Sequence, residues 1–132
     1  MSSPIVLTDS DEEGSLKSYN YTYCDNDSDE QLKLCRGLVY KNDKPFVKAY
    51  GYTPVYTIGE IYRNIDLTGC RFFYSLEGTL LRLFYNDINQ KWYLSTHKKL
   101  NARNSRWGNK KTYGEIFDSQ IQPDFYNKLD KN

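Results

Sequence analysis

Two pairs of apolar-rich runs predict two β-hairpins in this chain. Residues 37–50 contain two such runs separated by the turn-forming residues Lys-Asn-Asp-Lys. Residues 79–85 and 91–96 form the second pair, and the turn between them is rich in Asn and Asp. Apolar runs joined by residues of this kind are typical of antiparallel strands.

Helical patterns lie between and after these hairpins. Residues 57–66 predict a short helix or an irregular connection, and residues 112–121 predict a helix. Thr112 and Glu115 have the spacing of a capping box at the start of the second helix. Pro123 indicates that another helix begins there. The sequence therefore predicts an α+β fold with antiparallel β-hairpins and flanking helices.

The chain begins with an acidic stretch that shows no periodicity. Residues 1–30 hold eight acidic residues and one basic residue, whereas the rest holds 17 basic and nine acidic residues. We predict a disordered acidic leader over residues 1–18 and a folded domain over residues 19–132. The basic body favours an anionic ligand, and the leader could also be a solvated tail that limits aggregation.

Several classes of protein are disfavoured by the composition. The 132 residues include three cysteines without a Cys-x-x-Cys pair and a single histidine, so we expect no zinc or other metal site. No apolar stretch approaches the roughly 18 residues of a membrane span. The first residues lack the charged-then-apolar pattern of a secretion signal, so we expect none. We expect reduced thiols in an intracellular protein, either cytoplasmic or nuclear.

A small loop, residues 75–79, lies between an aromatic run and an apolar strand. Its Gly78 predicts a bend or a close backbone approach. Arg36-Gly37 precede the loop, Thr96-His97 end the later hairpin, and Gly114-Glu115 open the predicted helix. In this order and spacing, residues 19–132 resemble the adenylyltransferase domain of phage-type RNA ligases, within the wider nucleotidyltransferase superfamily.

This resemblance implies a nucleotide- or phosphate-binding site on the N-terminal half of a nucleotidyltransferase domain. In the family, a lysine at the position of Ser75 attacks the α-phosphorus of ATP, with Mg²⁺ present. Here serine replaces that lysine, and His97 stands where the family prefers Lys or Arg. The residues that the resemblance assigns to the nucleotide or phosphate are Arg36, Glu77, Gly78, Thr79, Thr96 and His97.

The family's downstream metal and triphosphate motifs have no counterpart in this chain. Glu77 alone is a weak Mg²⁺ site, so ATP and Mg²⁺ are implied only if the ligase-like site still works. We therefore expect no catalytic residue and a function in binding RNA, a nucleotide or a protein. The alternative is the front half of a split or reduced ATP-dependent RNA ligase. A half domain would also need a partner chain or self-association to cover its open edge.

A basic segment, residues 98–111, follows the second hairpin. It combines several basic residues with one tryptophan and contains no acidic residue. This pattern predicts RNA binding, although a solvated loop has the same composition. The residues concerned are Lys98, Lys99, Arg103, Arg106, Trp107, Lys110 and Lys111.

The leader contains the apolar trio Ile5, Val6 and Leu7, followed directly by hydroxyl and acidic residues that include Asp9 and Asp11. This resembles a SUMO-interacting motif, which adds a strand to the modifier's sheet while its acids face a basic rim. Such a partner implies a eukaryotic cell, or a virus that infects one.

Overall fold

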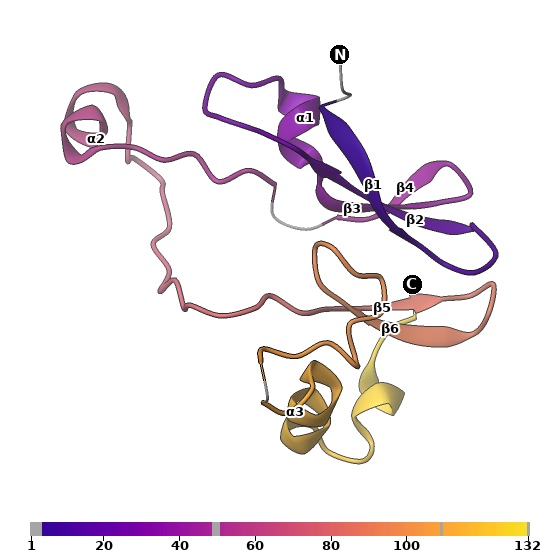
Figure 1. The fold of residues 1–132 in the computed structure, drawn as a ribbon. Coiled ribbons are helices and arrows are strands. Elements are labelled where there is room, and N and C mark those ends of the chain that lie inside the picture. The colour runs from indigo at the N-terminus through magenta and orange to yellow at the C-terminus, as the bar shows by residue number, and fades with distance from the viewer. Residues whose placement is uncertain (1–3, 49–50, 109, 132) are drawn as a thin grey trace.

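The computed structural model describes residues 4–48, 51–108 and 110–131. Two antiparallel sheets form the centre of the described part (Figure 1). The larger sheet has four strands in chain order and the smaller has two. The strands are β1 (Ile5–Ser10), β2 (Leu16–Tyr21), β3 (Arg36–Lys41), β4 (Lys44–Val47), β5 (Arg82–Asn86) and β6 (Lys91–Ser95).

Three short helices and one 3₁₀ turn complete the described elements. They are α1 (Glu30–Leu34), α2 (Ile58–Asn64), α3 (Tyr113–Gln120) and η1 (Phe125–Lys128). The chain is thus α+β, with antiparallel hairpins and flanking helices as predicted. Within the described ranges, no helix is long and apolar enough to cross a membrane.

Both predicted hairpins are confirmed, although residues 49 and 50 of the first prediction lie outside the described residues. β3 and β4 pair around Asn42 and Asp43, whose positive φ angles of 49° and 60° suit a tight two-residue turn. β5 and β6 pair in register from Arg82–Ser95 to Asn86–Lys91.

The predicted helices are confirmed in part. Thr112 caps α3 as expected, because its hydroxyl accepts from the Glu115 N–H at 3.1 Å while the Glu115 carboxylate accepts from the Thr112 N–H at 2.7 Å. Residues 57–66 contain α2, which also begins with a capping box, at Thr57. The stretch after Pro123 forms only the four-residue turn η1.

The prediction of a disordered leader over residues 1–18 is wrong for the described residues, because β1 and the start of β2 lie there. The boundary placed before residue 19 falls inside β2. The acids that suggested disorder instead shape the turn between the two strands. The Asp11 carboxylate accepts from the Ser15 hydroxyl and from the Leu16 N–H, and Gly14 adopts a φ of +71°.

The buried core joins the two sheets. Leu16, Val39, Phe84 and Leu100 form one apolar cluster, so each sheet and the segment after β6 contribute to it. The Phe84 ring stacks on Tyr93 at 5.3 Å and meets the edge of Phe46 at 5.8 Å. This core fixes β3 beside the end of β6, where the candidate site lies.

Residues 51–80 differ from this core in their exposure. Figure 1 shows the segment as a long excursion that carries α2 away from both sheets. Phe72, Phe73, Tyr74 and Leu76 are all at least 79% exposed. Exposed apolar side chains in such a run are unusual for a monomer.

Candidate functional site

A hollow of about 570 Å³ lies between the start of β3, the end of β6 and the loop after it. It collects residues from the distant parts of the sequence that carry the ligase-like pattern. Of the six predicted nucleotide-binding residues, all but Glu77 line it. Its lining residues are Arg36, Thr53, Gly78, Thr79, Leu80, Thr96, His97, Lys98, Ser105, Trp107 and Tyr113.

Gly37 allows Arg36 and His97 to lie side by side. Its φ is +72°, and a Cβ atom placed there would lie 2.6 Å from the His97 Cα. Only glycine fits this conformation and this close approach. On the other side, the Asn20 side-chain Nδ2 donates to the His97 carbonyl oxygen at 2.6 Å. Contacts from β2 and β3 therefore fix the position of the His97 backbone.

Arg82 adds a partly buried positive charge next to the hollow. Its guanidinium donates to the Gly37 carbonyl, to the Thr96 carbonyl at 2.8 Å and to the Ser95 hydroxyl at 3.2 Å. All three acceptors are neutral, and no carboxylate of the described residues forms an ion pair with it. Burial lowers the pKa of Arg82, but a guanidinium stays charged in proteins.

The positive charges around the hollow affect the pKa of His97. Burial lowers the pKa of its imidazole below the usual value, and the charges of Arg36, Arg82 and Lys98 lower the pKa further. The ring is therefore neutral at pH 7. An anion placed in the hollow would oppose these shifts and favour the charged imidazolium.

Thr79 connects the loop of residues 75–79 to the far wall of the hollow. Its hydroxyl accepts from the Trp107 indole N–H at 2.9 Å and lies 3.2 Å from the Tyr113 hydroxyl. Gly78 has a φ of +143°, which agrees with the predicted bend. Thr79 thus holds an aromatic side chain over the hollow.

Ser75 and Glu77 lie outside this arrangement. Both are exposed and neither lines the hollow. The neighbouring Tyr74 is fully exposed. The loop therefore divides: its Gly78–Thr79 end reaches the site and its Ser75–Glu77 end does not.

The basic segment is divided in a similar way. Lys98 and Trp107 line the hollow, whereas the Arg103 guanidinium pairs with the Asp118 carboxylate. Hydrogen bonds from Thr112, with smaller contributions from Arg106 and Lys111, lower the pKa of Glu115 at the start of α3. Lys110 is exposed.

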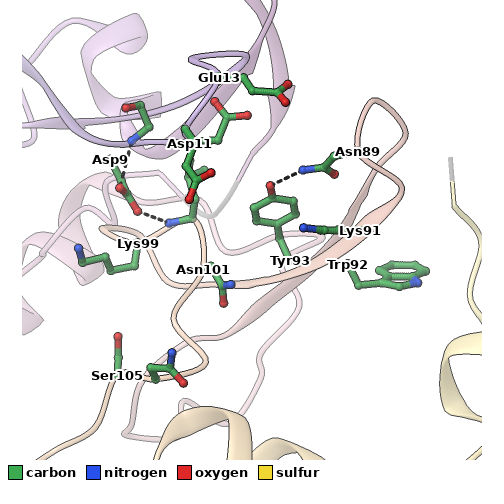
Figure 2. Close-up of a pocket in the computed structure, with 14 residues that line it drawn as sticks. Asp9, Asp11, Glu13, Asn89, Lys91, Trp92, Tyr93, Lys99, Asn101 and Ser105 are labelled. Atoms are coloured by element: carbon green, nitrogen blue, oxygen red, sulfur yellow. Dashed lines mark hydrogen bonds between the residues drawn. The ribbon is translucent and has the colours of Figure 1, made fainter.

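A second hollow, of about 630 Å³, lies on the other side of the segment after β6. Figure 2 shows Asp11 and Glu13 of the β1–β2 turn at one side of it, with Lys91 and Lys99 among its other lining residues. The Asp9 carboxylate accepts from the Leu100 N–H at 2.8 Å, and the Asn89 amide donates to the Tyr93 hydroxyl at 2.7 Å. Asp9 of β1 thus contacts the backbone of the segment after β6 directly.

The predicted modifier-binding residues are also part of the fold. Ile5, Val6 and Leu7 lie in β1, an edge strand, with Val6 and Leu7 exposed on its surface. Asp9 and Asp11 make the internal hydrogen bonds described above. Modifier binding stays a prediction, and its strand would have to add to the outer edge of β1.

The described residues contain no group of three or more His, Cys, Asp or Glu side chains that could hold a metal ion.

The sequence pattern did not predict two important residues of the site, Arg82 and Tyr113. Arg82 could have been noticed as the single charge in the apolar run of residues 80–85. Tyr113 gave no comparable signal, because its role comes from its contact with Thr79.

Two curated relatives match most of this chain. Both are named immediate-early protein ICP-46 homologue, one from Invertebrate iridescent virus 3 and one from Invertebrate iridescent virus 6. The first is 31% identical over 110 residues, which cover 76% of this chain and 24% of the relative. The second is 32% identical over 111 residues, which cover 74% and 23%.

The chain therefore spans about a quarter of the length of these curated relatives. No protein-family model and no solved structure matches it. Both relatives are viral proteins, and this similarity suggests the viral one of the two origins considered above.

Proposed function

We propose that this protein binds RNA through phosphate contacts in the hollow around Arg36 and His97, on a partial RNA ligase-like fold, without transferring a nucleotide. The observation that carries the proposal is the unbalanced positive charge of the hollow. Arg36, Lys98 and the adjoining Arg82 form no ion pair within the described part of the chain. A phosphate would supply the missing negative charge.

The position of the pattern residues supports the same ligand. Arg36 begins β3 whereas Thr96 and His97 directly follow β6, yet all three line one hollow with Gly78 and Thr79. These are five of the six positions to which the resemblance to RNA ligases assigned a nucleotide or phosphate. A guanidinium, a hydroxyl and an imidazole are all suitable donors to phosphate oxygens.

The surroundings of Ser75 support binding rather than catalysis. Nucleotidyl transfer needs a nucleophile held close to the α-phosphorus. Ser75 and Glu77 are exposed and do not line the hollow. Among the described residues, Lys98 is the lysine that lines the hollow, so it is the residue on which an adduct would form under the alternative function, a split or reduced RNA ligase.

The first test is the binding of a fluorescent single-stranded RNA of about eight nucleotides, a length within the range of single-domain sites. Affinity should fall steeply with added salt. Arg36→Ala should weaken binding about tenfold or more, because it removes a charge-assisted contact. Lys44→Ala, at an exposed position that begins β4, is the matched control and should change affinity little. Equal affinities for the two variants would contradict the proposal.

The alternative function has its own test. The protein is incubated with ATP and Mg²⁺ or Mn²⁺, and its intact mass is measured. We expect an unchanged mass. A nucleotidyl adduct that is absent in Lys98→Arg would instead establish the ligase-like chemistry.

A second candidate function is binding of a SUMO-type modifier, and the exposure of an edge strand favours it. Val6 and Leu7 are 38% and 52% exposed on β1, whose outer edge pairs with no described strand. Replacing both with Lys should abolish capture by the modifier. Val55→Lys, also at an exposed apolar position, is the control. Undiminished capture by the β1 variant would exclude this function.

A further inference from the structure

The two tryptophans of the chain have opposite surroundings. Trp92 packs against Tyr85 at 5.2 Å and Tyr126 at 5.7 Å between ring centres. Trp107 is 69% exposed, and its ring has no aromatic or cation–π partner among the described residues. Most of the Trp107 side chain is therefore accessible to a ligand.

The exposed ring of Trp107 is nevertheless held at its edge. Its indole N–H donates to the Thr79 hydroxyl at 2.9 Å, and that hydroxyl lies 3.2 Å from the Tyr113 hydroxyl. Tyr113 is fixed in turn, because its backbone N–H donates to the Ser105 carbonyl at 2.8 Å. These bonds use the edge of the indole and leave its faces available. A ring fixed in this way loses little conformational freedom when a ligand stacks on it.

Trp107 also lines the same hollow as Arg36, His97 and Lys98. The hollow measures about 570 Å³, which lies within the usual range for small-ligand sites. A nucleotide has both groups that this surface can accept, a phosphate for the cations and a planar base for the indole. A bare phosphate would leave the indole uncovered, and a paired base has its faces covered by its neighbours in the duplex.

We infer that Trp107, positioned by Thr79 and Tyr113, is a stacking platform for one unpaired base of an RNA strand whose phosphate lies at Arg36 and His97. This inference rests on the proposed function and specifies its ligand as single-stranded. Thr79 is then a positioning residue that acts through Trp107. Base–aromatic stacking tolerates any base. The platform therefore distinguishes single-stranded from duplex RNA and does not recognise a base sequence.

The test uses Trp92→Phe as the background, so that Trp107 is the only tryptophan and its fluorescence reports on the site. Three probes are compared: a single-stranded RNA of about eight nucleotides, an abasic strand with the same phosphates, and a duplex of the same length. The RNA strand should quench the fluorescence of Trp107. The abasic strand and the duplex should bind through their phosphates without quenching it.

Variants separate the platform from the phosphate contacts. Trp107→Leu should weaken binding of the RNA strand by about tenfold and should leave binding of the abasic strand unchanged. Thr79→Val should weaken binding of the RNA strand and reduce the quenching of Trp107. Both residues are exposed, and circular dichroism should confirm that the variants fold.

The possible outcomes distinguish the two proposals. If the RNA strand and the abasic strand bind equally, without quenching and without an effect of Trp107→Leu, the platform is excluded while the proposed function stands. If neither strand binds, the proposed function itself is wrong. Quenching that persists in Thr79→Val with unchanged affinity would exclude the positioning role of Thr79.

Discussion

The two parts of the ligase-like pattern lie in very different surroundings. Arg36 and His97 adjoin buried strands, and Asn20, Gly37 and Arg82 fix the backbone around them. Ser75 and Glu77 lie on the exposed excursion of residues 51–80. The residues that would hold a phosphate are therefore supported, whereas the position that would perform the chemistry is not.

This difference follows from what each task requires. Binding an anion needs several positive or polar groups near one another, and a packed pair of sheets provides that. Covalent transfer also needs a nucleophile held near its attack geometry. An exposed segment without strand pairing cannot maintain such a position by itself.

The largest expected loss of stability is at Gly37, in the supported part of the site. Gly37→Ala should lower the free energy of unfolding by about 3 kcal/mol, because it strains a φ of +72° and forces β3 away from His97. Gly78→Ala is the matched change on the exposed loop, where nothing lies within 4 Å of the added atom. It should cost about 1 kcal/mol. Urea denaturation measures both, and equal losses would contradict the distinction between the two regions.

A smaller effect should come from the contact between β1 and the segment after β6. Asp9→Ala removes the acceptor of the buried Leu100 N–H and should cost about 2 kcal/mol. Glu12→Ala, an exposed change in the same acidic turn, should leave the melting temperature nearly unchanged. If the two variants melt alike, the acids of the leader act only through their general charge.

His97 makes the body of the protein sensitive to pH. Its folded-state pKa lies below the ordinary value of about 6.5. As the pH falls below 6.5, the unfolded chain takes up a proton that the folded chain refuses, so stability should decrease. The stability is regained as the pH rises to the unfolded pKa. Denaturation at several pH values should show this slope, and His97→Gln should reduce it.

Phosphate binding should respond to pH in the opposite direction. A bound anion favours the imidazolium, so the affinity for RNA should increase as the pH falls toward the pKa of His97. His97→Gln should flatten this dependence. An affinity that falls on acidification would place the phosphate away from His97.

The smallest effect is expected from restoring the family's nucleophile. Ser75→Lys should produce no adduct with ATP and Mg²⁺, because residue 75 does not line the hollow. Its stability should also be unchanged, since the position is exposed. Intact mass measures the first outcome. An adduct on residue 75 would show that the excursion can close over the site.

The sequence by itself determined the local elements of this protein. The hairpins β3–β4 and β5–β6 and the capped start of α3 depend on neighbouring residues, and the pattern predicted each of them. β1 was missed because acids that suggest disorder in isolation, such as Asp11, can equally bind the backbone of a turn. Whether these residues are disordered or form an ordered turn depends on the packing of Leu16 in the core.

Only the tertiary structure decided which of the pattern residues meet. Arg36 and His97 lie about 60 residues apart in the chain, and their proximity depends on the approach that Gly37 permits. Arg82 joins the site through carbonyl groups of other strands, and Ser75 is excluded from it by the exposed path of its segment. The sequence determines which chemical groups are present, whereas long-range packing sets the distances between them. Charge interactions and chemical reactions both depend on those distances.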